Sequence, residues 1–97
     1  FGPIGAVIGY DDDEEANAMA NASAFCLSGA IWSADAVEAF DMALRIRTGG
    51  VSINGGAGTM QSDAPFGGIK RSGYGREYGE DGLNEFTYQK VISFSAK

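Results

Sequence analysis

Three consecutive segments in the middle of the chain decide its fold: Ser28-Gly29-Ala30-Ile31-Trp32-Ser33, then residues 35–47, then Gly50-Val51-Ser52-Ile53-Asn54. The first and third are short runs, mostly apolar, of the kind that forms strands. The middle segment has the spacing of a helix. The order strand–helix–strand predicts a βαβ unit with a parallel sheet, wrapped right-handedly, and hence the α/β class.

The segment 35–47 is the clearest helix in the sequence. Val37, Phe40 and Leu44 recur at helical spacing and line one face. Acidic residues occupy its first half and arginines its last turn, as the helix dipole favours. Gly49 is the predicted C-terminal stop.

Further elements flank this unit on both sides. The apolar run 4–10 predicts a strand buried on both faces or nearly so. The acidic residues after it open a helix that Asp12 or Asp13 can cap. A glycine-rich loop follows the third strand, and then come a weak helix around 76–84 and a long strand over 85–96. A long apolar strand at a chain end needs a partner sheet, so we expect assembly through it.

The composition argues against several classes of function. The 97 residues include no His and one Cys, and the formal net charge is −6. The commonest general base is therefore missing, and neither an internal disulfide nor a cysteine zinc site can form. Seven basic against thirteen acidic residues argue against a nucleic-acid partner, and no apolar run reaches the ~18 residues of a membrane span. We expect a soluble protein located in the cytoplasm.

Four features invite a chemical interpretation, and each has a plainer one. Residues 55–59 lack the ending of a phosphate-binding loop, so we expect a flexible loop. Cys26 lies among apolar neighbours and is predicted to be buried and structural. The acidic run 11–15 is contiguous, which suits a helix start better than a calcium loop. Arg76 and Glu77 are predicted to form an ion pair that holds the glycine-rich segment. We therefore expect no catalytic residue and no metal site.

The stretch 64–77 is different in kind, because Pro65 and several glycines mount Phe66 on a rigid turn. An aromatic held this way is either a pocket wall or a core plug, and physical reasoning alone does not choose between them.

The same stretch carries a resemblance to a known family. The pattern P-F-G-G-x-K-x-S-G-x-G-R-E from Pro65 to Glu77 closely resembles the C-terminal part of the NAD(P)-dependent aldehyde dehydrogenase superfamily. Three other segments resemble family motifs in the same order: Phe1-Gly2-Pro3 the end of E-x-F-G-P, residues 21–30 the segment N-x-S-x-Y-G-L-S-x-x, and residues 47–54 the strand R-x-x-x-G-x-V-x-x-N. The resemblance therefore covers the whole chain. Cys26 departs from it, since the family usually has Gly at this position.

The resemblance implies roles for particular residues. Phe1 matches the residue beside the nicotinamide ribose, and Leu27 matches a side chain of the nicotinamide pocket. Phe66 matches an aromatic of the aldehyde tunnel, and the preceding loop, around Thr59 and Met60, matches the family's variable anchor loop. The implied cofactor is NAD or NADP, and the implied substrate is a small-molecule aldehyde.

The resemblance also implies how the chain is organised. Residues 1–85 would be the C-terminal portion of a catalytic domain and residues 86–97 an oligomerisation strand, which forms a homodimer or homotetramer through 86–96. In the parent enzyme a thiolate attacks the aldehyde, hydride passes to the nicotinamide, and the thioester is hydrolysed. The groups that react would lie upstream of this segment, so the chain alone would be inactive.

The beginning of the chain fits this interpretation, because Phe1 leads straight into an apolar run with no initiator Met. We expect a piece of a longer protein. The alternative is a free-standing, non-catalytic dimerising module derived from the same fold. A coding sequence that continues in frame upstream of Phe1 supports the first; a start codon just before Phe1 supports the second.

Overall fold

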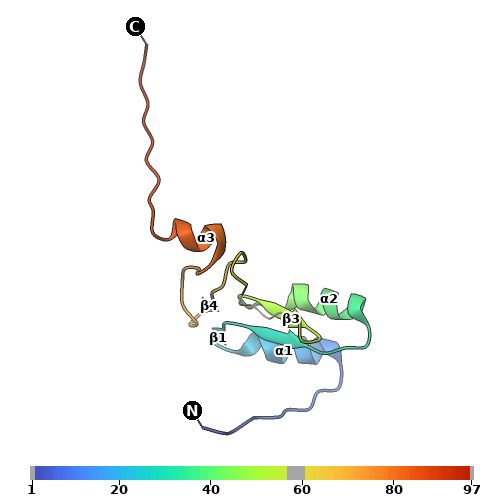
Figure 1. The fold of residues 1–97 in the computed structure, drawn as a ribbon. Coiled ribbons are helices and arrows are strands. Elements are labelled where there is room, and N and C mark those ends of the chain that lie inside the picture. Colours follow the sequence, from blue (N-terminus) through green and yellow to red (C-terminus); the bar gives the residue numbers. More distant parts are fainter. Residues whose placement is uncertain (1, 57–60, 97) are drawn as a thin grey trace.

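The computed structural model describes residues 2–56 and 61–96. Two longer helices and three short strands lie within residues 13–53, and the rest of the described chain adds one short strand and one short helix (Figure 1). The elements are α1 (Asp13–Ala22), β1 (Phe25–Cys26), β2 (Gly29–Ile31), α2 (Ala36–Arg45), β3 (Val51–Ile53), β4 (Ile69–Lys70) and α3 (Gly79–Asn84).

The predicted βαβ unit is present at the centre of the structure. Strands β2 and β3 pair in parallel with Gly29 opposite Val51, and α2 connects them. Asn54 extends the pair beyond the last strand residue, because its side-chain amide accepts from the Ser33 N–H at 3.0 Å and donates to the Ser33 carbonyl at 2.9 Å. The α/β class and the parallel pairing of these two strands are confirmed.

Both long helices begin where the sequence predicts. The Asp12 carboxylate accepts from the backbone N–H of Glu15 at 2.8 Å and caps α1. Asp35 caps α2 by accepting from the N–H groups of Val37 and Glu38 at 2.8 and 3.0 Å. These bonds satisfy backbone donors that a helix start leaves without partners. The acidic run therefore acts as a helix start, as predicted.

The predicted stop of α2 at Gly49 is wrong. The helix ends at Arg45, and Ile46 is already extended, with φ −77° and ψ 120°. The side chain of Asn21 on α1 hydrogen-bonds to the backbone groups at this helix end. It donates to the Arg45 carbonyl at 3.0 Å and accepts from the Arg47 N–H at 2.7 Å. A side chain distant in sequence thus ends the helix, and no glycine is needed.

The predicted strands at 4–10 and 85–96 are wrong for the described structure. Both segments run away from the folded centre (Figure 1), and neither belongs to a strand of the described residues. Val7 and Phe86 are 97% and 90% exposed. A strand needs a neighbour to receive its backbone hydrogen bonds, and the described part of the chain supplies none for these segments.

The strands form two separate pairs instead of one parallel sheet. In the second pair β1 and β4 run antiparallel, with Phe25 opposite Lys70 and Cys26 opposite Ile69. The sequence analysis missed both strands, because each is two residues long and too short to show an alternating pattern. The weak helix predicted around 76–84 is present as α3.

Little of the described chain is fully buried. Cys26 and Ala39 are 5% and 1% exposed, which confirms Cys26 as a buried residue, whereas Trp32 is 75% exposed. The molecule is elongated, with extents of 70 × 34 × 24 Å. None of the helices in the described residues is long and apolar enough to cross a membrane.

Candidate functional site

The structure brings two predicted site residues, Leu27 and Phe66, to one surface hollow of about 200 Å³. Leu27 follows β1, and Phe66 precedes β4. Glycine backbone and polar side chains complete the lining: Gly67, Gly68, Ser72, Tyr74, Gly75, Arg76 and Glu77. The predicted site residues Phe1, Thr59 and Met60 lie outside the described residues.

Two hydrogen bonds to Glu77 hold Phe66, one through its N–H and one through its carbonyl. Its N–H donates to the Glu77 carbonyl at 2.8 Å, and its carbonyl accepts from the Glu77 N–H at 2.7 Å. The ring packs against Tyr78 with centroids 6.2 Å apart and planes tilted by 54°. Phe66 is half-buried and borders the hollow, so its place is that of a pocket wall.

The part of the lining around Leu27 is held by the segment 69–72. The Ser72 hydroxyl accepts from the Cys26 N–H at 2.8 Å, and the Arg71 N–H donates to the Ala24 carbonyl at 3.0 Å. Both bonds hold the segment that leads directly into Leu27. A segment distant in sequence therefore sets the position of this part of the lining.

Lys70 adds a charged contact between the segment 69–72 and the end of α1. Its ammonium donates to the carbonyls of Asn21 and Ser23 at 2.7 and 2.9 Å. The last turn of α1 contains no basic residue of its own, so Lys70 supplies the cation that the carbonyl end of a helix favours. Lys70 holds this position with φ +54°, a conformation in which few residues other than glycine are found.

Arg76 holds the other side of the hollow, although by different contacts from those predicted. Its guanidinium donates to the carbonyls of Gly68 and Gly75 at 2.9 and 2.7 Å, and its N–H donates to the Glu85 carboxylate at 3.1 Å. The predicted ion pair with Glu77 is wrong. Within 2–56 and 61–96 the structure records no such pair, because backbone carbonyls occupy the guanidinium. Arg76 does hold the glycine-rich segment, as expected.

Glycines allow three parts of the chain to meet behind the hollow. A Cβ on Gly49 would overlap the Gly67 carbonyl oxygen and lie 2.8 Å from the Leu27 carbonyl oxygen. A Cβ on Gly67 would lie 2.5 Å from the Gly75 carbonyl oxygen and 2.9 Å from the Arg76 Cδ. The absence of a side chain at these positions is what lets the two walls approach each other.

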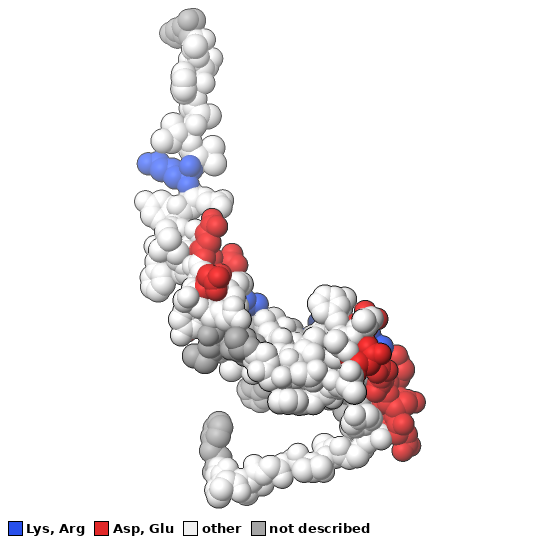
Figure 2. Space-filling view, turned by 45° about the vertical axis from the view of Figure 1, so that its right-hand side comes forward, with Lys and Arg blue, Asp and Glu red and all other residues white. Residues whose placement is uncertain are grey.

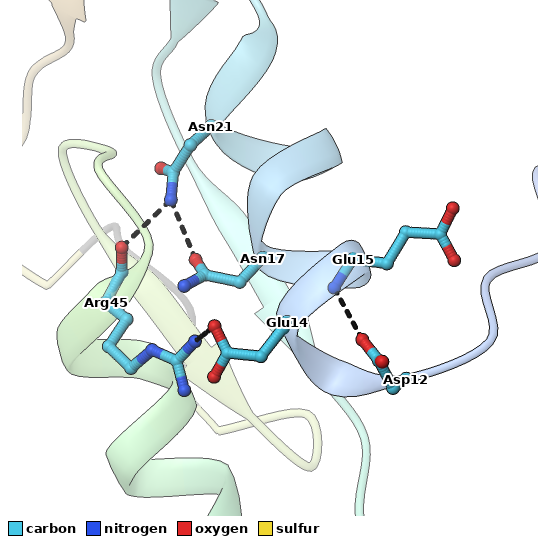
Figure 3. Close-up of polar contacts among 6 residues, drawn as sticks. All are labelled: Asp12, Glu14, Glu15, Asn17, Asn21 and Arg45. Carbon is cyan, nitrogen blue, oxygen red and sulfur yellow. Dashed lines mark hydrogen bonds and ion pairs between the residues drawn. The ribbon is translucent and has the colours of Figure 1, made fainter.

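A separate charged region joins α1 and α2. Arg45 forms an ion pair with Glu14 at 2.6 Å, beside the Asn21 contact to the Arg45 carbonyl (Figure 3). Acidic side chains gather along this edge of the molecule (Figure 2). Its members border one shallow groove: Asp13, Glu14, Asp35, Glu38 and Asp41. Among them, Asp35 caps α2 and Glu14 pairs with Arg45 across the contact between α1 and α2.

Comparison with known proteins identifies the class to which this fold and hollow belong. Residues 1–92 match the aldehyde dehydrogenase family, and the chain therefore belongs to that family. It is 47% identical over 92 residues to a succinate-semialdehyde dehydrogenase [NADP(+)] from Deinococcus radiodurans, covering 95% of this chain and 19% of that protein. The chain thus spans about a fifth of the length of this relative.

Solved structures agree. An aldehyde dehydrogenase from Mycobacterium tuberculosis complexed with NAD+ superposes with a TM-score of 0.86 at 39% identity, over 98% of this chain and 20% of that one. A variant of an aldehyde dehydrogenase from Pseudomonas syringae, in complex with NAD+ and octanal, superposes with a TM-score of 0.75 at 43% identity, over 81% and 16% of the two chains.

The sequence analysis did not assign roles to Lys70 and Ser72. Both occur in the quoted motif, as the K and S of K-x-S-G, so the motif was the available signal. Their partners lie near residues 21–26, and only the tertiary structure shows these contacts.

Proposed function

We propose that this chain is the C-terminal part of an NAD(P)-dependent aldehyde dehydrogenase that oxidises an aldehyde to a carboxylic acid. The observation that carries the proposal is the meeting of Leu27 and Phe66 at one hollow in a chain that belongs to this family. The chain would supply walls of the site, and the reacting groups would come from other parts of the parent enzyme.

The hollow suits one end of a nicotinamide cofactor. At about 200 Å³ it is smaller than a complete ligand pocket, for which about 300–1,000 Å³ is typical. An apolar side chain and an aromatic ring border it, and such surfaces pack well against a planar ring. Leu27 would pack against the nicotinamide, and Phe66 would orient the aldehyde and exclude water. When bound, NAD(P) supplies the hydride acceptor.

For the substrate we propose a semialdehyde. Support comes from the relatives: the Deinococcus radiodurans protein and a succinate semialdehyde dehydrogenase [NAD(P)+] from Escherichia coli are each 47% identical to this chain. The test is to compare succinate semialdehyde with octanal in the full-length enzyme. A higher kcat/KM for octanal would contradict this choice of substrate.

We also propose that residues 86–96 pair with a second subunit, in a dimer or tetramer. This segment carries large apolar side chains that the rest of the described chain leaves uncovered: Phe86, Tyr88, Val91, Ile92 and Phe94, all at least 79% exposed. Such a surface favours burial against a partner. Deletion of residues 86–97 should lower the oligomer mass in light scattering, and an unchanged mass would contradict the proposal.

The activity itself is tested on the full-length protein. We expect aldehyde-dependent formation of reduced nicotinamide, detected by its absorbance, and a measured preference between NAD and NADP. The 97-residue chain alone should show none. A full-length protein without this activity, or a start codon just before Phe1, would favour the non-catalytic dimerising module instead.

A further inference from the structure

Ser72 makes a side-chain hydrogen bond that spans 46 residues of sequence and ends one residue before Leu27. We propose that Ser72 is a positioning residue: its bond to the Cys26 N–H sets the place of Leu27 at the hollow that Phe66 also lines. This inference rests on the proposed function, since it assigns Leu27 to the nicotinamide side of that site.

Among the described residues, backbone contacts hold Leu27 more firmly than side-chain packing does. Leu27 is 43% exposed, so its neighbours cover it only in part. Cys26, in contrast, is 5% exposed, and a buried N–H without a partner is costly. Ser72 supplies that partner at 2.8 Å. The Ser72 hydroxyl therefore supplies the hydrogen bond of the Phe25–Cys26 peptide group, one residue before Leu27. The Arg71–Ala24 bond and the pairing of β1 with β4 hold the neighbouring backbone.

The position of the Ser72 hydroxyl is itself fixed by contacts with β4 and Gly68. A tight turn joins Ser72 to β4, with the Ser72 N–H donating to the Ile69 carbonyl at 3.2 Å. Ser72 also lies close against Gly68, where an added Cβ would come within 2.5 Å of the Ser72 Cβ. The Gly68 carbonyl in turn accepts a hydrogen bond from the Arg76 guanidinium at 2.9 Å. Ser72 therefore connects the turn after β4 to the backbone before Leu27. Its own position depends on Gly68, which lies two residues after Phe66.

The test uses the full-length enzyme with Ser72→Ala, and the main measurement is the Kd of NAD and of NADP by titration calorimetry. Loss of one such hydrogen bond corresponds to about a fivefold rise in Kd. The KM for coenzyme should rise similarly, with a smaller change in kcat. Ser33→Ala is the matched control, since its hydroxyl accepts a comparable bond from the Asp35 N–H at 3.1 Å, outside the hollow. The control should keep the wild-type Kd.

A double-mutant cycle with Leu27→Ala separates positioning from a general loss of stability. If Ser72 acts through Leu27, Ser72→Ala has little further effect on Kd in the Leu27→Ala background. Additive effects, or a Kd that Ser72→Ala leaves unchanged, would overturn the inference. If the Ala variant does not fold, Ser72→Cys keeps the shape with a weaker acceptor. A raised Kd then supports the proposal and a wild-type Kd overturns it.

Failure of the proposed function looks different from failure of this inference. A wild-type protein that neither binds NAD(P) nor oxidises aldehydes would refute both. A wild-type enzyme that does both, with Ser72→Ala variants like wild type, would refute the role of Ser72 alone.

Discussion

Replacing Gly49 with Ala tests the close approach that brings the two walls of the hollow together. The new Cβ would lie 2.7 Å from the Gly67 carbonyl carbon and 2.8 Å from the Leu27 carbonyl oxygen. Ordinary contact begins at 3.4 Å, so the Leu27 carbonyl oxygen must retreat by about 0.6 Å and the overlapped Gly67 carbonyl oxygen by more. Binding sites need their groups within about 0.5 Å of the productive geometry. The substitution should therefore affect both stability and coenzyme binding.

The expected size follows from overpacking of rigid backbone. Such changes cost about 1–3 kcal/mol, and the Gly49 position belongs at the upper end because both obstacles are backbone atoms. For domains of about 150–250 residues each kcal/mol lowers Tm by about 2–4 °C. In the full-length enzyme we expect a Tm at least about 4 °C lower and a raised KM for coenzyme.

Gly29→Ala is the control for this experiment. A Cβ there would meet only Thr48 Cγ2 at 3.8 Å and Ile46 Cγ2 at 4.0 Å, which is ordinary contact. Thermal unfolding and steady-state kinetics of both variants give the comparison. A Gly49→Ala enzyme with wild-type Tm and KM, or an equal loss in Gly29→Ala, would refute the reasoning.

Three further substitutions test other contacts in the full-length protein. Phe66→Ala should raise KM more for apolar aldehydes than for small polar ones, because it removes an apolar wall; equal effects in steady-state kinetics would remove Phe66 from the pocket. Asp35→Ala should cost about 1 kcal/mol in chemical unfolding through loss of the α2 cap, while Asp35→Asn keeps an acceptor and should stay close to wild type. Glu14→Gln should change stability by less than about 0.5 kcal/mol, because the pair with Arg45 is 78% and 41% exposed; a larger loss would show a stronger pair.

Two apolar segments show why pattern alone predicts too many strands. Residues 4–10 and 85–96 have the composition of strands, yet neither belongs to a strand of the described residues. Their large apolar side chains are exposed, and residues 85–86 form a turn at the end of α3. Composition indicates that a segment can be a strand, but pairing depends on a neighbour that must be present in space.

In the site, too, the sequence indicated some of the residues, whereas only the structure shows their contacts. The family resemblance brought Leu27 and Phe66 forward, and the structure places both at one hollow. The Arg76 contacts were predicted only in part: the sequence suggested an ion pair with its neighbour, and the structure shows bonds to the Gly68 and Gly75 carbonyls. Backbone acceptors carry no signature in the sequence, so such contacts escape a search for charged pairs.

The sequence by itself determined the βαβ unit, both helix starts and the family, because each depends on residues close together in the chain. Helical spacing and an Asp before the first turn act locally. The tertiary structure alone decided where α2 ends, through Asn21, and how Leu27 is held, through Ser72. Those bonds join residues that lie far apart in sequence, and only folding brings their polar groups within hydrogen-bond distance.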